Sequence, residues 1–156
     1  MTDDARFEDG REVPLNLGAF DADDLQVISA LSQDAVFPVT EMRWRGKQRQ
    51  FALLINRFRW EDPGRARHDP ERVQSLLVFE NVLAVASQGL DRSDEDLILS
   101  LMSIAFSASE DGAGDVLLTL SGDGAIRLRV EALEARLRDV TRPYAAPSRK
   151  APDHSL

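Results

Sequence analysis

The sequence predicts an α+β protein that is mainly antiparallel β-sheet, folded as a sandwich or partly open barrel of about seven strands. Many short segments alternate apolar with polar residues, which is the pattern of half-buried strands. Glycine-containing turns follow several of these segments, and one segment near the N-terminus repeats apolar residues at helical spacing instead. A helix is therefore expected before the strands, and a C-terminal helix after them is an open alternative. A pleckstrin-homology-like barrel would fit this order, as an analogy of fold alone.

Length and composition indicate one globular domain. The chain has 156 residues, of which 43% are hydrophobic and 29% are charged, values that are ordinary for a globular protein with a substantial core. We assign the domain to residues 14–140. Residues 1–13 are acidic and expected to be disordered, and residues 141–156 contain three prolines and are expected to form a mobile tail without regular structure.

Several classes of protein are excluded by what the sequence lacks. Without cysteine there are no disulfides, thiolate metal sites or thiol catalysis, and this composition suits a reducing cytoplasm. No apolar run approaches the roughly 20 residues of a membrane helix, and the acidic N-terminus does not resemble a secretory signal. We therefore expect a cytoplasmic protein that does not enter a membrane.

The first helix is expected at residues 23–34, after an extended lead-in at residues 14–20. Leu25, Ile28 and the leucine three residues later recur at helical spacing. Asp21 is placed to cap the helix, and the acidic residues of the first turn complement the helix dipole. Capping explains this acidic cluster better than a metal site does.

The stretch at residues 37–60 is the most informative part of the chain. Met42 and Trp44 share one strand parity, while Arg43 and Arg45 take the other, which is the alternation of a half-buried strand. The Gly-Lys pair that follows is suited to a tight turn, since glycine tolerates positive φ. A return strand is therefore expected directly after it.

That return strand carries Phe51, Leu53 and Ile55 on one face. After Asn56 the apolar parity changes, because Phe58 is the next apolar residue. A one-residue slip of this kind is what a β-bulge produces. We predict a bulge near Asn56.

A loop and two strands are expected next. Residues 62–72 are rich in arginine and proline; a binding tip and a solvated crossover are both open, and we favour the crossover. Two strand patterns follow within residues 73–88, with a hairpin turn, a bend or a bulge at Asn81 between them. Residues 91–96 superficially resemble a calcium loop but lack its glycine and distal glutamate, so we expect Ser93 to cap one helical turn there.

Three segments complete the domain. Residues 97–106 (LILSLMSIAF) are apolar nearly all round, and we favour a fully buried central strand over a buried helix. Alternating apolar residues on both sides of a Gly-Asp-Gly turn predict a hairpin at residues 116–130. Residues 131–140 (EALEARLRDV) change to a helical period and consist of good helix formers, so we favour a helix over a strand there.

The central part of the chain is basic within an acidic protein. Residues 36–79 hold nine Lys or Arg against five Asp or Glu, although the net charge of the whole chain is −8 and its pI is about 4.8. Such a segment can attract an anionic partner through its local field. The overall acidity argues against general nucleic-acid binding, which depends on neutralising phosphates.

The candidate binding residues lie in this basic segment: Arg43, Trp44, Arg45, Arg57, Arg59 and Trp60. Both residue types are enriched at binding hot spots, and arginine pairs bidentately with carboxylate or phosphate. We predict a non-enzymatic binding or adaptor module that uses a basic aromatic sheet face, with another protein or a second copy of this chain as partner. An enzyme or sensor that binds a small anionic metabolite in an arginine-lined pocket is the alternative. A third interpretation, with both tryptophans in the core and the arginines on a solvated face, also stays open.

The sequence offers no catalytic, metal or cofactor motif. It has no glycine-rich phosphate loop, dinucleotide fingerprint or nucleophile elbow. Its two histidines, His68 and His154, fall in a loop and in the tail, which leaves no positioned residue for histidine-based catalysis. We predict no catalytic residue, no metal and no cofactor.

Four segments carry a resemblance to a known family. They read PLNLGAFDADDLQVISALSQDAVFPVTEMRWR, FALLINRFRWE, RVQSLLVFENV and RDVTRPYAAPSRKAPDH. In these segments the chain resembles a family of small alphaproteobacterial proteins catalogued as domain of unknown function 2948, over residues 14–154. The resemblance implies a bacterial cytoplasmic protein and no particular activity, so no functional residue is carried over from it.

Overall fold

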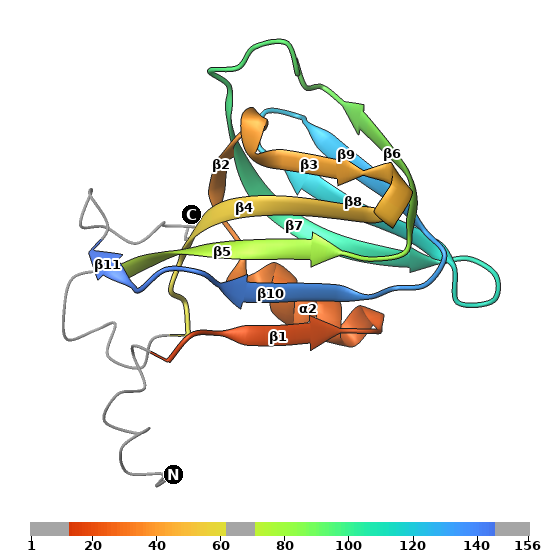
Figure 1. Ribbon diagram of the computed structural model, residues 1–156, viewed down its shortest axis with the longest axis horizontal. Coiled ribbons are helices and arrows are strands. Elements are labelled where there is room, and N and C mark those ends of the chain that lie inside the picture. Colours follow the sequence, from red (N-terminus) through yellow and green to blue (C-terminus); the bar gives the residue numbers. More distant parts are fainter. Residues whose placement is uncertain (1–12, 62–70, 146–156) are drawn as a thin grey trace, which may run out of the picture.

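The computed structural model describes residues 13–61 and 71–145, which form a curled antiparallel sheet with an α-helix packed against it (Figure 1). The elements in chain order are β1 (Asn16–Ala19), α2 (Ala22–Leu31), β2 (Val36–Pro38), η1 (Val39–Glu41), β3 (Met42–Arg45), η2 (Gly46–Gln48), β4 (Gln50–Phe58), β5 (Glu71–Phe79), β6 (Val82–Gln88), β7 (Ile98–Ala108), β8 (Gly114–Leu120), β9 (Ala125–Val130), β10 (Ala135–Asp139) and β11 (Tyr144–Ala145). Here η1 and η2 are short 3-10 helices on either side of β3.

The strands pair in the order β1-β10-β5-β4-β2-β7-β8-β9-β6, and each of these pairings is antiparallel. In addition, β3 pairs with β4, and β11 pairs with β5. The order does not close on itself, so the mainly antiparallel, partly open fold is confirmed. The described residues form eleven strands, not about seven. The additional strands are β1, β2 and β11, which have four residues or fewer, and β10, which forms in the segment predicted to be a helix.

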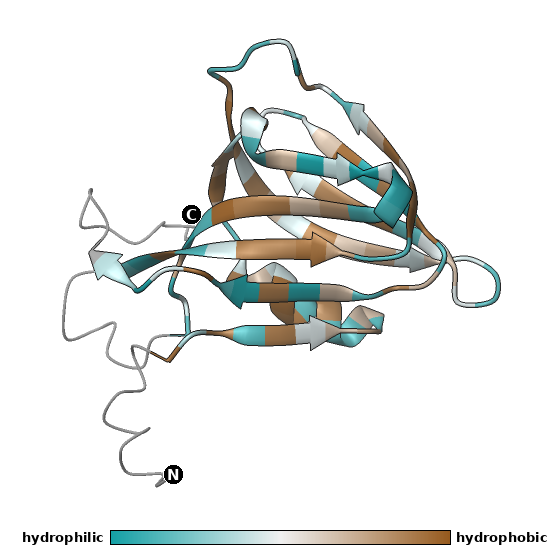
Figure 2. Ribbon diagram, viewed as in Figure 1, coloured by the Kyte–Doolittle hydropathy of each residue, from teal (hydrophilic) through white to brown (hydrophobic). Residues whose placement is uncertain are grey.

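The core lies inside the curve of the sheet. In β8 and β9, Val116 is paired with Leu128 and Leu118 with Ile126, and all four side chains are buried. Arg127, between two of these positions, is exposed on the outer face. Figure 2 shows hydrophobic residues alternating with polar ones along many of the strands. The predicted hairpin is confirmed.

The helix α2 begins where capping chemistry places its N-terminus. The backbone N–H of Asp24 donates to Oδ1 of Asp21 at 2.8 Å. Leu25 and Ile28 are buried, and the helix packs against β7 and β1, which are far apart in the strand order. The helix therefore covers the lower side of the curled sheet (Figure 1). The predicted N-terminal helix is confirmed, although it ends earlier than expected.

Residues 131–140 do not form the predicted helix; the alternative, a strand, is found in β10. Ala135, Leu137 and Asp139 are buried, while Arg136 and Arg138 are exposed on the other face. Both edges of β10 are paired, one with β5 and the other with β1. These pairings and the burial of alternate side chains override the helix propensity of the segment.

The bulge predicted near Asn56 is not found. The register of β4 with β5 runs through eight consecutive residue pairs without a shift. The inward positions of β4 continue from Ile55 to Arg57, so a charged residue takes the place where an apolar one is expected. The apolar alternation in the sequence is therefore interrupted by a buried arginine and not by a shift in strand register.

Residues 97–106 lie in a strand, as predicted, but β7 is not fully buried. Leu99, Leu101 and Ile104 face the core. Ile98 is 59% exposed, because it lies on the outer face of the sheet. The strand is therefore half-buried, despite its continuous apolar sequence.

Two connections, at Asn81 and at residues 91–96, are neither hairpin turns nor helical turns. Asn81 has a left-handed backbone (φ 59°) between β5 and β6, which pair with different strands, so the segment is a bend. Residues 91–96 form turns in which the side chain of Asp91 accepts from Ser93 N at 3.0 Å. The predicted helical turn capped by Ser93 is wrong, because Ser93 is the donor and Asp91 the acceptor.

The predictions for the chain ends and for one loop fall largely outside the described residues. These are the disorder of the acidic N-terminus, the arginine-rich crossover and most of the proline-rich tail. At the start of the segment predicted to be a tail, Tyr144 pairs with Arg72 in β5, and its hydroxyl accepts from Nδ2 of Asn56 at 2.6 Å. Regular structure therefore extends beyond residue 141, because the edge of β5 offers a further pairing partner.

Candidate functional site

The two faces of β3 carry different side chains. Arg43 and Arg45 lie on the outer face of the sheet, and Met42 and Trp44 lie on the face toward the inside of the curve. Among the described strands, β3 pairs with β4 alone, from Met42 opposite Leu53 to Arg45 opposite a glutamine. The alternation expected from the sequence is therefore present, and it points the arginines and Trp44 in opposite directions.

Arg43 begins a row of side chains that crosses four strands. It pairs in register with Ala52 of β4, which pairs with Val78 of β5, which pairs with Arg136 of β10. Adjacent strands lie about 4.8 Å apart, so the Cα atoms of the two arginines are separated by about 14 Å. An arginine thus lies on each side of a small apolar floor.

The floor and its two sides form a shallow depression of about 390 Å³ on the outer face of the sheet. Four arginines line it, two from β3 and two from β10, and we call it the arginine depression. Its lining residues are Arg43, Arg45, Gln50, Ala52, Leu76, Val78, Glu80, Glu134, Ala135, Arg136 and Arg138.

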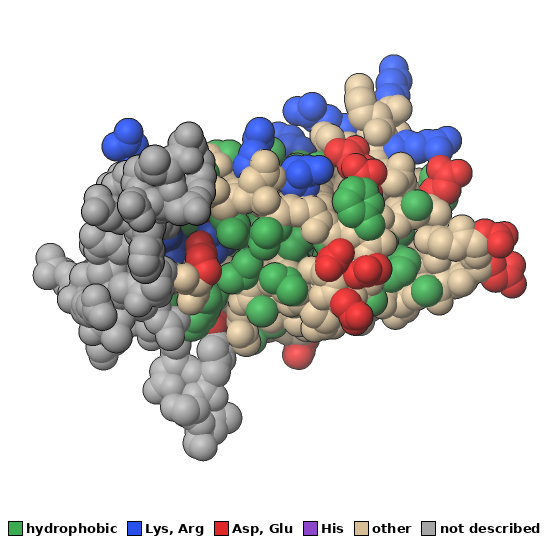
Figure 3. All heavy atoms as spheres, turned by 90° about the horizontal axis from the view of Figure 1, so that it is seen from below, with side chains coloured by type: hydrophobic (Ala, Val, Ile, Leu, Met, Phe, Trp, Pro, Cys, Tyr) green, Lys and Arg blue, Asp and Glu red, His purple; other side chains and the backbone are tan. Residues whose placement is uncertain are grey.

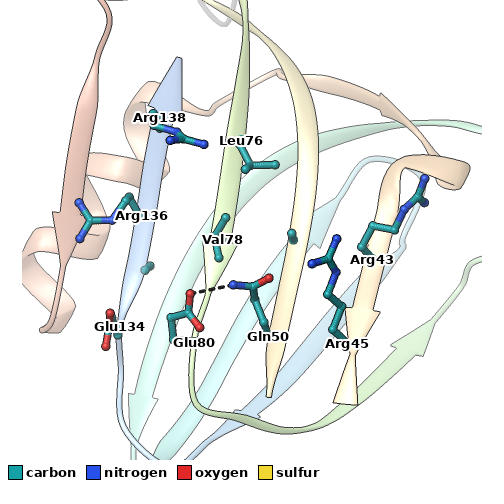
Figure 4. Close-up of a pocket in the computed structure, with 11 residues that line it drawn as sticks. Arg43, Arg45, Gln50, Leu76, Val78, Glu80, Glu134, Arg136 and Arg138 are labelled. Carbon is teal, nitrogen blue, oxygen red and sulfur yellow. Dashed lines mark hydrogen bonds between the residues drawn. The ribbon is translucent and has the colours of Figure 1, made fainter. Parts of the chain in front are cut away.

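The four arginines differ in direction (Figure 4). Arg45 and Arg138 point over the floor from opposite sides. Arg43 and Arg136 point away from it: Nη1 of Arg43 donates to the carbonyl oxygen of Thr40, and Nη1 of Arg136 donates to Oδ1 of Asn16 at 3.4 Å. The first pair is therefore oriented to contact a molecule in the depression, and the second pair is held at its flanks.

The charges around the depression are unevenly distributed. Within the described residues, none of the four arginines has a carboxylate at ion-pairing distance. Glu80 and Glu134 lie together at one end, where Glu80 accepts from Nε2 of Gln50 at 3.0 Å. Figure 3 views the molecule from below, so its upper rim is the face seen in Figure 1, and Lys and Arg side chains gather along that rim. The depression combines unpaired positive charge with one acidic end.

Arg57, predicted to lie on the same face, is instead completely buried. Its guanidinium donates to Oδ1 of Asp139 at 2.9 Å, and in bidentate fashion to Glu61 at 2.8 Å for each bond. Its Nε donates to Ser75 Oγ at 3.0 Å. We call Arg57, Glu61, Ser75 and Asp139 the buried ion-pair cluster. A buried guanidinium needs such partners, so this arginine is held inside the sheet.

Arg59 and Trp60 also lie away from the depression. Arg59 is buried and forms an ion pair with Glu71. The indole N–H of Trp60 donates to the carbonyl oxygen of Gln33 at 3.1 Å, and its ring meets Phe58 edge-on. The structure therefore separates the six candidate residues: two line the arginine depression, Trp44 lies on the opposite side of β3, and three belong to packed or ion-paired positions.

The buried ion-pair cluster changes the protonation behaviour of its members. Burial opposes ionisation of Glu61, but the hydrogen bonds and the charge of Arg57 outweigh it and lower the pKa of Glu61. Burial likewise disfavours the charge of Arg57, yet Glu61 and Asp139 together raise its pKa above the ordinary value. Both groups therefore stay charged at neutral pH.

Sequence reasoning missed Arg136 and Arg138. A helix is favoured over a strand for their segment in the sequence, and residues on a helix would not form a row with Arg43 across a sheet. The signal that could have found them is the alternation in Ala135-Arg136-Leu137-Arg138, which repeats the pattern of β3.

Two further properties concern the described residues alone. They contain no group of three or more His, Asp or Glu side chains placed to hold a metal ion. No helix among them combines the length and the apolar character that a membrane span requires.

These observations define a small, mainly antiparallel β domain whose curved sheet carries an arginine-lined surface depression. The model of the family described as "Protein of unknown function (DUF2948)" matches residues 15–154, nearly the whole chain. The protein is therefore a member of the DUF2948 family, which confirms the resemblance noted in the sequence. Neither a curated protein nor a solved structure matches the chain.

Proposed function

We propose that this protein is a non-enzymatic binding module whose arginine depression binds an acidic, extended segment of another protein. The observation that supports this most is the arrangement of four arginines, without ion-pair partners among the described residues, on both sides of an apolar floor. Arginine binds carboxylates in a directed, bidentate manner, and apolar contact between such anchors adds affinity.

The shape of the site favours an extended segment. The floor formed by Ala52, Leu76 and Val78 is a narrow strip between β3 and β10. In a strand-like peptide that alternates acidic and apolar residues, the apolar side chains of one face could lie on this strip, and the carboxylates of the other face could be reached by the long side chains of Arg45 and Arg138, which extend over the floor. Such a ligand uses both features of the depression.

The chemistry of the lining supports binding more than catalysis. Among the described residues that line the depression there is no Ser, Thr, Cys, His, Lys or Tyr, so a nucleophile of those types is missing. A second candidate function, recognition of a small anionic metabolite, is supported by the two arginines, Arg45 and Arg138, that point over the floor (Figure 4). We propose the cytoplasm of an alphaproteobacterium as the setting, in line with the cysteine-free sequence and the resemblance.

The test uses two fluorescent peptides, one of alternating Glu and Leu and one of Glu alone, with binding followed by anisotropy. We expect the alternating peptide to bind more tightly. The Arg45→Glu/Arg138→Glu variant should weaken that binding by about tenfold or more, because each charged hydrogen bond contributes about 1.5–3 kcal/mol. Arg127→Glu/Arg129→Glu, an equal change of charge on the outer face of β9, is the matched control.

Three results would contradict the proposal. They are equal binding by the two variants, absence of binding to both peptides, and equal affinity for both peptides. Titration with citrate and inorganic phosphate tests the second candidate: binding of these anions that depends on Arg45 and Arg138, without peptide binding, would favour a metabolite site. Sedimentation of the wild-type protein and the two variants shows whether a second copy occupies the face.

A further inference from the structure

A second site lies where the open sheet fails to close. Among the described strands, β3 pairs only with β4 and β6 only with β9, so one edge of each is unpaired. The gap between them is closed at one end, where Val82 N donates to the carbonyl oxygen of Arg49 at 2.8 Å. Figure 1 shows β3 and β6 close together at this end and diverging away from it. The gap is therefore a wedge.

This wedge contains a cleft of about 280 Å³, which we call the seam cleft. Its apolar walls come from η1, β3, β4, β6 and β9: Val39, Met42, Trp44, Phe51, Val85 and Ile126. Trp44 is 42% exposed, which leaves ring surface available to a ligand. The cleft thus connects the surface with the apolar interior of the sheet.

The cleft also has polar lining residues, two of which are charged. Arg92 and Glu95 come from the connection between β6 and β7, and the hydroxyls of Thr40 and Ser87 complete the polar set. Neither Arg92 nor Glu95 has an ion-pair partner among the described residues, so each charge is available to a ligand. One connection thus brings a guanidinium and a carboxylate to the cleft.

The connection that carries this pair is anchored to the domain. Leu90 and Leu97 pack against the core on either side of it, and the carbonyl oxygen of Leu97 accepts from Val39 N at 2.9 Å. Between them, Asp91 accepts from Ser93 N at 3.0 Å, and the backbone N–H of Leu97 donates to the carbonyl oxygen of residue 94 at 3.1 Å. Arg92 and Glu95 are therefore held at the cleft by defined turns.

We propose that the seam cleft binds a free α-amino acid with a large apolar side chain. The apolar side chain would lie against Trp44, Phe51 and Val85, the carboxylate would pair with Arg92, and the ammonium would pair with Glu95. The volume of about 280 Å³ suits a molecule of this size and lies just below the range of pockets for larger ligands, which begins at about 300 Å³. A fatty acid would leave the charge of Glu95 without a partner, and an apolar amine would leave Arg92 without one. This site is separate from the arginine depression, on the opposite face of β3.

The test is titration of the intact protein with L-phenylalanine, 3-phenylpropionate and phenethylamine, which share a ring but differ in head group. Binding is followed by calorimetry and by the fluorescence of Trp44, with Trp60→Phe as the background that isolates this signal. We expect L-phenylalanine to bind about tenfold more tightly than either analogue. Arg92→Gln should remove the preference over phenethylamine, and Glu95→Gln should remove the preference over 3-phenylpropionate.

Both substitutions lie at exposed positions, so the variants should fold. Val85→Arg, which fills the cleft, should abolish binding of all three compounds, and Arg45→Glu/Arg138→Glu should leave it unchanged. The last control distinguishes this proposal from the function of the arginine depression. The proposal is overturned if L-phenylalanine does not bind at millimolar concentration, if the three compounds bind equally, or if Arg92→Gln and Glu95→Gln leave the preferences intact.

Discussion

Arg57 and Asp139 meet inside the sheet, with Nη2 of the arginine 2.9 Å from Oδ1 of the aspartate, although 82 residues separate them in the chain. Asp139 also accepts from Ser75 Oγ at 2.7 Å and from the backbone N–H of Leu15 at 2.9 Å. One carboxylate therefore connects β4, β5, β10 and the segment before β1. The contact ties the N-terminal edge of the sheet to its centre.

Removal of this carboxylate should strongly destabilise the protein. Asp139→Ala leaves a buried guanidinium with one carboxylate partner fewer, and we expect a loss of about 3–5 kcal/mol in the free energy of unfolding. Urea unfolding followed by circular dichroism measures it. Asp115→Ala, which breaks the surface pair with Arg129, is the control and should cost about 1 kcal/mol or less. Similar losses in the two variants would show that burial does not strengthen the cluster.

Glu61 should contribute to the loss of folding stability at acidic pH. Its pKa is lowered in the folded state, so its stabilising contribution is complete above the unfolded value near 4.5 and is lost as the pH falls through the folded value. Below about pH 5, stability should therefore fall more steeply for the wild type than for Glu61→Gln. Thermal unfolding over a pH series tests this, with the exposed Glu131→Gln as control. A wild-type slope equal to that of Glu61→Gln would contradict it. The raised pKa of Arg57 acts only at pH values above the range of the experiment.

The fold class was predictable from the sequence because alternation in most strands reflects burial on one face. The hairpin of β8 and β9 and the helix capped by Asp21 depend on neighbouring residues, so local patterns suffice for them. β10 was not predictable in this way, since its strand form depends on β5 and β1, which are distant in the sequence.

The candidate site was predictable only in part for the same physical reason. Arg43 and Arg45 carry a local strand pattern, whereas their counterparts in β10 reach the depression through long-range pairing. Arg57 and Arg59 look like surface residues in the sequence. Glu61 is close to both in the chain, but Asp139 and Glu71, the other carboxylates that permit their burial, are distant in the sequence. Whether these arginines are exposed or buried therefore depends on partners that only the fold brings close to them.

The apolar floor of the arginine depression should contribute to the binding of the alternating Glu-Leu peptide and not to the binding of the peptide of Glu alone. Leu76→Ala shortens a side chain of the floor that lies beside Arg138 and is half-buried on the outer face. We expect weaker binding of the alternating Glu-Leu peptide by a few-fold, in line with about 1 kcal/mol of lost apolar contact, and no change for the peptide of Glu alone. Anisotropy titration measures both. Equal weakening of both peptides would indicate a disturbed sheet instead of a lost contact.

The pairing of β7 with β8 should be sensitive to a single methyl group at Gly114. A Cβ atom there would overlap the carbonyl oxygen of Ser107 and lie 2.7 Å from the ring of Phe106, so the two strands must separate or the ring must move. We expect Gly114→Ala to lower the free energy of unfolding by about 1–3 kcal/mol, as overpacking does elsewhere. Gly46→Ala is the matched control, because its Cβ would meet the Trp44 ring at 3.6 Å, an ordinary contact, and should change stability by about 0.5 kcal/mol or less. Urea unfolding of both variants tests this prediction. If Gly114→Ala is as stable as Gly46→Ala, β7 and β8 can separate at this point without loss of folding free energy.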